Sequence, residues 1–173
     1  MKEEEKARAE QKAKLVNFIQ KIPVFSTLSP YKAKLILSLC SKIVLGERNI
    51  LCKQGDSSDS MFILLQGKLA VKIKNSVTIA TIHPVSSIGE MGVFTNEPRT
   101  ATVEVMEKSI LLCLQKSDLD KLIEKDHQFA IKIMRKVIEV LSERITEDNV
   151  KIREFQNYII SQEEAKKANS NNS

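Results

Sequence analysis

All five glycines of this chain lie between Gly46 and Gly92. In and around that region, short runs alternate apolar and polar residues: 42–45, 49–53, 60–65, 68–74, 77–82, 100–105 and 109–114. Alternation with a period of two, with turn residues at the junctions, is typical of β-strands. Several short strands at this spacing predict an all-β sandwich or barrel in the middle of the chain.

Both flanks of this region have a helical pattern instead. Residues 1–22 are expected to form an N-terminal helix whose second half carries an apolar stripe, made of Leu15, Val16, Phe18, Ile19 and Ile22. After Pro23, Ser29 is the expected N-cap of a second helix that starts at Pro30. Beyond the strands, Ser117 is the expected N-cap of another short helix.

The C-terminal segment, residues 128–160, contains neither glycine nor proline. Steps of four and three residues connect its stripe, which runs through Met134, Ile138, Leu141, Ile145, Asp148, Ile152, Phe155 and Ile159, and only Asp148 in it is polar. A heptad stripe on so long a helix predicts a coiled-coil partner, most simply a second copy of the chain. The alternative is that the first half packs on the β domain and the rest frays. Residues 161–173 are polar and are expected to be disordered.

The composition excludes several classes of protein. A chain of 173 residues fits one domain with an appended helix. The net charge of +5 is spread along the chain, so it predicts neither a nucleic-acid nor a membrane surface. The three cysteines form no C-x-x-C pair, so we expect reduced thiols and no metal site. Since neither a secretory signal nor a transmembrane run is present, a cytoplasmic location is expected.

The segment from 88 to 101 carries the chemistry. Gly89 and Gly92 flank Glu90 at the start of a short apolar turn, and Arg99 follows behind Pro98. Glycine lets the backbone approach a ligand, free N–H groups in a first helical turn favour phosphate, and arginine can bind phosphate through two hydrogen bonds. Without an obvious nucleophile, this set indicates binding of a small phosphorylated sugar. A turn held by an ion pair between Glu90 and Arg99 is the alternative.

Over residues 22–160 the chain resembles the cyclic nucleotide-binding domain family, which includes the sensor domain of the catabolite activator protein. Gly89-Glu90-Met91-Gly92-Val93 and Pro98-Arg99-Thr100-Ala101 match the family's phosphate-binding cassette. Residues 54–56 and 60–67 match a second signature, a strand pair that contains a glycine. The resemblance implies a mainly β fold with flanking helices, in which a β-roll or jelly-roll barrel lies between N-terminal helices and a long C-terminal helix.

The resemblance also implies the ligand-binding residues, which are Gly89, Glu90, Met91, Gly92, Arg99, Thr100 and Ala101. Arg99 would bind the cyclic phosphate, together with backbone amides around Gly92 and Thr100. Glu90 and the Gly89 backbone would bind the ribose 2′-hydroxyl. Threonine at position 100 often accompanies cGMP in the family, whereas serine there is typical of cAMP sensors.

The resemblance also implies two residues outside the cassette that would contact the base. Counting forward along the C-terminal helix places the residue that caps the base at Arg144, and a solvated surface charge is the alternative. Ile79 is expected beneath the base as its floor or, alternatively, in the barrel core. The chain departs from the family at Val85-Ser86, where members often carry Gly-Asp, and this departure is expected to alter the turn before the cassette.

The implied function is a non-enzymatic cAMP or cGMP sensor that signals by repositioning its C-terminal helix. Its expected partners are the cyclic nucleotide, a second copy of the chain through that helix and an effector protein, with no cofactor. The expected organisation is a helix over 1–22, the binding domain over 23–127, the long helix over 128–160 and the tail over 161–173. The alternatives are a structural or interaction dimer with a degenerate pocket, and a DNA-binding regulator truncated before its helix-turn-helix.

Overall fold

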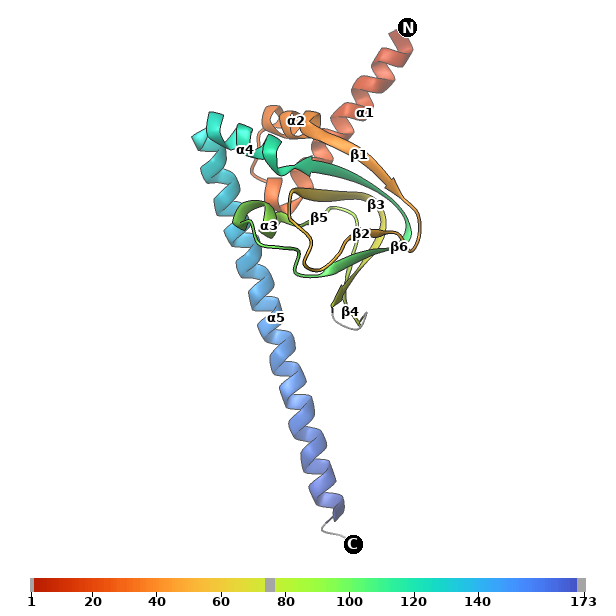
Figure 1. Ribbon diagram of the computed structural model, residues 1–173, viewed down its shortest axis with the longest axis vertical. Helices are drawn as coiled ribbons and strands as arrows, with labels where there is room; N and C mark the ends of the chain where they lie inside the picture. The colour runs from red at the N-terminus through yellow and green to blue at the C-terminus, as the bar shows by residue number, and fades with distance from the viewer. Residues whose placement is uncertain (1, 74–76, 171–173) are drawn as a thin grey trace. The chain divides into compact units, whose positions relative to one another are not determined.

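The computed structural model describes residues 2–73 and 77–170. The chain divides into two compact units, Met1–Val137 and Ile138–Ser173. The first unit holds the sheet and most of the helices, and the second consists of the later part of the last helix. Figure 1 labels the elements along the chain.

The sheet of the first unit is antiparallel throughout its described part. Its strands are β1 (Cys40–Leu45), β2 (Ile50–Cys52), β3 (Ser60–Ile73), β4 (Val77–Ile82), β5 (Ser86–Ile88) and β6 (Thr102–Gln115). The strand order is β1-β6-β3-β4, while β2 also pairs with β6 and β5 also pairs with β3. This arrangement, with helices at both ends of the chain, confirms the predicted mainly β roll with flanking helices.

The two central strands are longer than the sequence predicts. Residues 60–65 and 68–74 were expected as separate strands, but Ser60–Ile73 is continuous and pairs with the equally continuous β6. Gly67 lies in the middle of β3 with a φ of 100°, and a Cβ atom there would lie 2.7 Å from the Ser109 Cα atom. The register shifts around this point, so Gly67 lets the paired strands bend where a turn was predicted.

The core of the roll lies between the strands. Its buried residues are Cys52, Phe62, Leu64, Leu69, Ile88, Val103, Val105, Leu111 and Cys113. Leu69 lies opposite both Val105 and Ile82 across the ladders, so one face of three neighbouring strands contributes to this core. Complete burial of a leucine or valine stabilises the fold by about 1.5–3 kcal/mol. The core therefore fixes the strand ends that lead into the candidate site.

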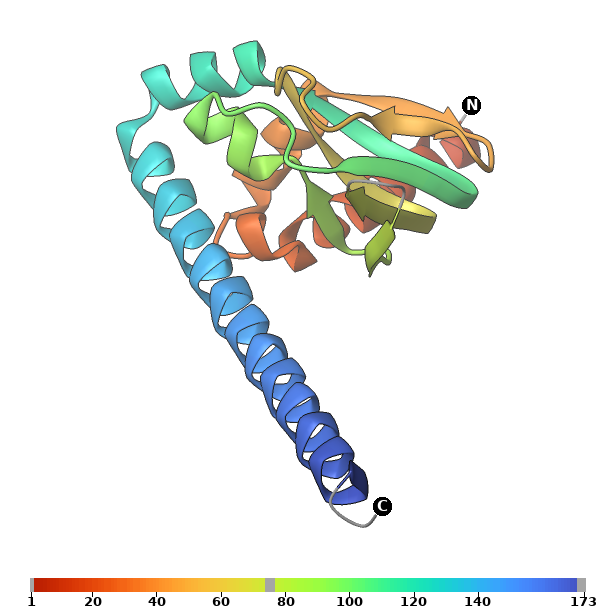
Figure 2. The same ribbon diagram turned by 60° about the horizontal axis from the view of Figure 1, so that its bottom comes forward.

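Three helical elements precede the sheet: α1 (Lys2–Lys21), η1 (Pro23–Phe25) and α2 (Pro30–Leu39). The predicted Ser29 cap is confirmed, because its Oγ atom accepts a hydrogen bond from the Lys32 N–H at 3.4 Å. Ile19, Phe25 and Ile36 are fully buried, one from each element. Figure 1 and Figure 2 show α1 and α2 lying next to each other.

The helices after the sheet are α4 (Lys116–Lys125) and α5 (His127–Ser170). The prediction of Ser117 as the N-cap of α4 is wrong, because Gln115 holds that position. The Lys116 N–H donates to the Asp59 carbonyl oxygen at 2.8 Å, so a neighbouring loop supplies the acceptor that a capping side chain would provide. No helix in the described part of the chain is long and apolar enough to span a membrane.

The last helix extends further than predicted. It begins at His127, one residue earlier than expected, and ends at Ser170 rather than near residue 160. Residues 161–170 of the tail that was expected to be disordered are therefore helical, while 171–173 lie outside the described residues. In the second unit, exposed residues of the heptad stripe include Ile138, Ile145, Ile152, Phe155 and Ile159.

Candidate functional site

The predicted cassette begins at the short helix α3 (Glu90–Thr95). Gly89 is its N-cap and has a φ of 82°, a backbone conformation that side chains other than glycine rarely adopt. A Cβ atom at Gly89 would also overlap the Nη1 atom of Arg99. Both the backbone angle and the close approach therefore require glycine, and they bring the start of α3 against Arg99.

The first part of the second signature, residues 54–56, holds the backbone of Arg99. The Gly55 N–H donates to the Arg99 carbonyl oxygen at 2.9 Å, and the Arg99 N–H donates to the Asp56 carbonyl oxygen at 2.8 Å. The Asp56 carboxylate also accepts a hydrogen bond from the Lys53 N–H at 2.8 Å, which closes the turn. The two sequence signatures are thus parts of one structure, because the turn of one fixes the arginine of the other.

The Arg99 guanidinium is buried, with 8% of the residue exposed. Its Nη2 atom donates to the Ser60 carbonyl oxygen at 2.5 Å and to the Ser60 Oγ atom at 3.4 Å. Its Cζ atom lies 5.5 Å from the ring centroid of Phe62. The Nε and Nη1 atoms are buried and have no hydrogen-bond acceptor among the described residues. Because such donors are costly to bury unpaired, the arrangement suits an anion.

The other cassette residues differ in their exposure to solvent. Glu90 is the first residue of α3 and is only 2% exposed. Met91 is 43% exposed, Thr100 is exposed and Ala101 is half-buried. The cassette therefore contains a buried acid, Glu90, and a buried cation, Arg99, together with the exposed Thr100.

Gly92 lies where α3 meets the loop before β3. A Cβ atom at this position would overlap the Ser58 side chain and would lie 2.7 Å from the Glu97 carbonyl oxygen. Ser58 is 7% exposed, and its Oγ atom has no hydrogen-bond partner among the described residues. Gly92 is therefore needed for close packing, in addition to any contact with a ligand.

The positive charge of Arg99 affects the buried thiol of Cys52. Burial raises the pKa of the Cys52 thiol, and the positive charge of Arg99 opposes part of that rise. Cys52 belongs to the core of the roll. The guanidinium lies beside this core, because its Cζ atom is 5.5 Å from the ring centroid of the core residue Phe62. Its interactions with charged groups are stronger there than in water.

Two predicted residues lie away from the cassette in sequence. Ile79 is in β4 and is 55% exposed, which excludes the alternative that it belongs to the barrel core. Across the ladders, its neighbours Thr78 and Ala80 face Lys72 and Val71, which in turn face the first residues of β6. Arg144 is exposed on α5 within the second unit. The contacts of both residues with a base remain predictions.

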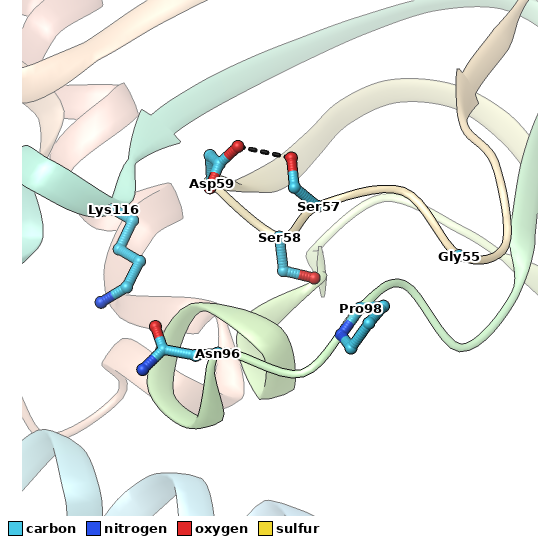
Figure 3. Close-up of a pocket in the computed structure, with 7 residues that line it drawn as sticks. All are labelled: Gly55, Ser57, Ser58, Asp59, Asn96, Pro98 and Lys116. Atoms are coloured by element: carbon cyan, nitrogen blue, oxygen red, sulfur yellow. Dashed lines mark hydrogen bonds between the residues drawn. The ribbon is translucent and has the colours of Figure 1, made fainter.

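A cavity of about 370 Å³ borders the cassette, but none of the predicted ligand-binding residues lines it. It is lined by Gly55, Ser57, Ser58, Asp59, Asn96, Pro98 and Lys116 (Figure 3). The Ser57 hydroxyl donates to the Asp59 carboxylate at 2.5 Å on its wall. Lys116 forms an ion pair with Asp120 at 2.7 Å. Because Lys116, the cation that lines this cavity, is already paired with a carboxylate, the cavity is a weaker candidate for binding an anion than the Arg99 site.

Sequence reasoning missed three residues of the site: Ser58, Ser60 and Phe62. Ser60 and Phe62 stand within the second signature, but they were quoted only as parts of a strand. Their two-residue spacing places them on one face of β3, and that pattern could have grouped them. The sequence does not reveal that this face meets Arg99. No cluster of three or more His, Cys, Asp or Glu side chains arranged to bind a metal occurs among the residues searched, which are the described ones.

Part of the chain is similar to known proteins. Residues 42–126 match the family model described as Cyclic nucleotide-binding domain. A cyclic nucleotide-gated potassium channel of Mesorhizobium japonicum is 29% identical over 115 residues, which are 66% of this chain and 31% of the channel. A cAMP-dependent protein kinase regulatory subunit of Dictyostelium discoideum is 25% identical over 93 residues, which are 50% of this chain and 28% of that protein. The chain thus spans about a third or less of these relatives.

Solved structures share the fold. A cyclic nucleotide-binding domain from Methylobacillus flagellatus has a TM-score of 0.68 and 22% identity, with 80% of each chain covered. The regulatory domain of Toxoplasma gondii PKA, crystallised with cAMP, has a TM-score of 0.61 and 20% identity, covering 65% of this chain and 44% of that one. At these identities, the similarity shows a common fold.

Proposed function

Because residues 42–126 belong to the cyclic nucleotide-binding domain family, we propose that this chain is a regulatory module that binds a cyclic nucleotide at Arg99. The observation that carries the proposal is the buried guanidinium with two nitrogen atoms, Nε and Nη1, that have no acceptor among the described residues. A cyclic phosphate has one negative charge and two free oxygen atoms, so it would neutralise the arginine and accept its hydrogen bonds.

The burial of these two nitrogen atoms also sets a condition on binding. Each has almost no surface in contact with solvent, so a neighbouring segment has to shift before a phosphate reaches it. The segment that includes α3 is the element that moves in this proposal, because Gly89 lies directly against Nη1. Binding would thereby be coupled to a small movement of the cassette.

The remaining contacts of the ligand follow from the family cassette. Glu90 and the backbone of Gly89 bind the ribose 2′-hydroxyl in this proposal, and the exposed Thr100 hydroxyl faces the entering nucleotide. Threonine at this position makes cGMP a candidate ligand alongside cAMP. Ile79 is the proposed floor beneath the base, and Arg144 is its proposed cap.

Signalling in this proposal uses α5, the helix that both units share. A ligand that binds one arrangement of this helix more tightly shifts the population toward it, and a useful switch needs a coupling of about 1–3 kcal/mol. The exposed heptad stripe would pair with a second copy of the chain. Lys151 Nζ lies 2.9 Å from Asp148 Oδ1, so the one acid in the stripe has a countercharge on its own helix.

In this proposal the role is regulatory and not catalytic, and an effector protein recognises the position of α5. A cytosolic location, expected from the sequence, is part of the same proposal. Thermal unfolding in the presence of nucleotides tests it. We expect cAMP or cGMP to raise the melting temperature, because a ligand at about 100 times its Kd stabilises the native state by about 2.7 kcal/mol.

The matched control in this experiment is 5′-AMP, a linear phosphate monoester with the same base and sugar as cAMP. It should raise the melting temperature much less than the cyclic nucleotides do. If neither cAMP nor cGMP shifts the transition of folded protein, the pocket does not bind nucleotides. The alternative of a structural or interaction dimer would then be favoured.

A further inference from the structure

One strand, β3, contacts the Arg99 guanidinium from two directions. Ser60 accepts hydrogen bonds from Nη2 through its carbonyl oxygen at 2.5 Å and through its hydroxyl at 3.4 Å. The ring of Phe62, two residues further along, lies 5.5 Å from the Cζ atom. Side chains separated by two residues along a strand lie on the same face, so the Ser60 hydroxyl and the Phe62 ring share one face of β3, and the Ser60 carbonyl oxygen adds a backbone contact.

This face of β3 has a fixed position. Phe62 lies opposite Cys113 of β6 and opposite Ile88 of β5, so strands pair with it on both sides. Its side chain belongs to the buried core, with 7% of the residue exposed. A ring held this firmly has little freedom to move away from the guanidinium.

The two contacts use different parts of the guanidinium. Ser60 engages only Nη2, and an aromatic ring interacts with a cation without accepting a hydrogen bond in the guanidinium plane. The Nε and Nη1 donors are left without an acceptor among the described residues. The strand thus restricts the position of the guanidinium while leaving donors for an anion.

We propose that Phe62 and Ser60 are positioning residues that hold the Arg99 guanidinium in the orientation that binds the anionic phosphate of the ligand. This inference rests on the proposed function, because it concerns the same arginine. Neither residue contacts the nucleotide in this proposal, so both act on affinity only through Arg99. Preorganisation of this kind raises affinity because less freedom is lost when the ligand binds.

Calorimetric titration with cAMP and cGMP tests the proposal in a double-mutant cycle. Phe62→Leu removes the ring and should weaken binding about tenfold, whereas Phe62→Tyr keeps the ring and should stay within about threefold of the wild type. Arg99→Lys supplies a compact charge without the planar guanidinium. In the Arg99→Lys background, Phe62→Leu should weaken nucleotide binding by less than about threefold.

The cycle separates positioning from a general structural role. An equal loss from Phe62→Leu in both backgrounds would mean that the ring supports the fold of the site and not the arginine, and this would overturn the inference. So would wild-type affinity in the Phe62→Leu protein. If Phe62→Leu does not fold, Phe62→Met is the replacement, because it keeps the volume of an apolar side chain without a ring.

Ser60→Ala gives an independent reading, since it removes the hydroxyl and keeps the carbonyl oxygen. We expect a loss of about two- to threefold, in line with a single long hydrogen bond. An unchanged affinity would show that the Ser60 hydroxyl does not help to position Arg99. Failure of the wild-type protein to bind either nucleotide would overturn the proposed function, and the inference with it.

Discussion

Val85 has a φ of 72°, which is a strained backbone conformation for a β-branched residue. The family that the chain resembles often has glycine here, a residue that adopts this conformation without strain. The turn is fixed by a hydrogen bond from the Val85 N–H to the Leu64 carbonyl oxygen at 3.2 Å. The strain therefore lies in the turn that leads through β5 to the cassette.

Val85→Gly should relieve this strain. A left-handed conformation costs a non-glycine residue about 1–2 kcal/mol, while glycine loses more backbone entropy on folding. We expect a net gain of about 0.5–1 kcal/mol in the free energy of unfolding, measured by urea denaturation. The matched control is Val77→Gly in the exposed edge strand β4, which should destabilise the protein. Equal destabilisation by the two substitutions would contradict the strain at Val85.

Gly92→Ala tests close packing in the cassette. The added Cβ atom would overlap the Ser58 side chain, so α3 has to move, and we expect a loss of about 1–3 kcal/mol in the free energy of unfolding. Ser58→Gly should restore part of that loss in the double variant, because it removes the side chain. Additive effects of the two substitutions would show that the contact between them is unimportant.

At the level of residues, the sequence predicted the groups with clear chemistry. Gly89, Glu90 and Arg99 could be identified because they stand in a motif. Phe62 could not, because an aromatic residue at a core position of a strand carries no signal of the arginine beside it. That contact depends on the pairing of β3 with strands distant in sequence.

At the level of elements, most helices and strands were predictable, but their ends were less so. Two predicted pairs of short strands form the single strands β3 and β6. In β3, Gly67 bends the strand within the ladder instead of ending it. The start of α4 was misplaced because its acceptor comes from Asp59, a tertiary contact. The site depends on these long strands, since β3 supplies both neighbours of Arg99.

The start of α5 has an electrostatic contact that a pH titration can test. Asp126 caps this helix by accepting a hydrogen bond from the Phe129 N–H at 2.9 Å, and it also pairs with Lys32 of α2. The hydrogen bond from Lys32, followed by that from Phe129, lowers the pKa of the Asp126 carboxyl below its ordinary value. The stabilisation is present above the unfolded pKa and is lost as the pH falls through the folded pKa.

Asp126→Asn should therefore lower stability at pH 7 and make little difference in acid, because asparagine can cap the helix but cannot form the ion pair. We expect the gap in the free energy of unfolding between wild type and variant to narrow from pH 7 to about pH 3. Urea denaturation across this range measures the gap. A gap that is independent of pH would show that the ion pair does not stabilise this junction.

The stripe on α5 gives a second test at this scale. Ile152 is in the heptad stripe and is 56% exposed, whereas Val150 is 47% exposed but lies outside the stripe. If two copies pair through the stripe, Ile152→Glu should convert the dimer to a monomer, while Val150→Glu should leave it intact. Sedimentation equilibrium measures the mass of each. A monomeric wild-type protein, or equal effects of the two substitutions, would contradict the proposed pairing.

At the scale of the whole molecule, the fold class followed from the pattern of the sequence. The alternating middle, which holds all five glycines, became the roll, and the flanking segments without glycine became helices. The length of the last helix did not follow, since its polar C-terminal residues gave no apolar pattern beyond residue 160, yet the helix continues to Ser170. Regulation would depend on this helix, because it is the element that both units share.

The central claim is that Arg99 binds the phosphate of a cyclic nucleotide, and calorimetric titration of three proteins tests it most directly. We expect the wild type and Arg153→Ala, an exposed arginine in the second unit, to bind cAMP or cGMP equally. Arg99→Ala should lose measurable binding while remaining folded, because the guanidinium supplies the charged hydrogen bonds to the phosphate in this account. Undiminished binding by Arg99→Ala, or no binding by the wild type, would contradict the claim.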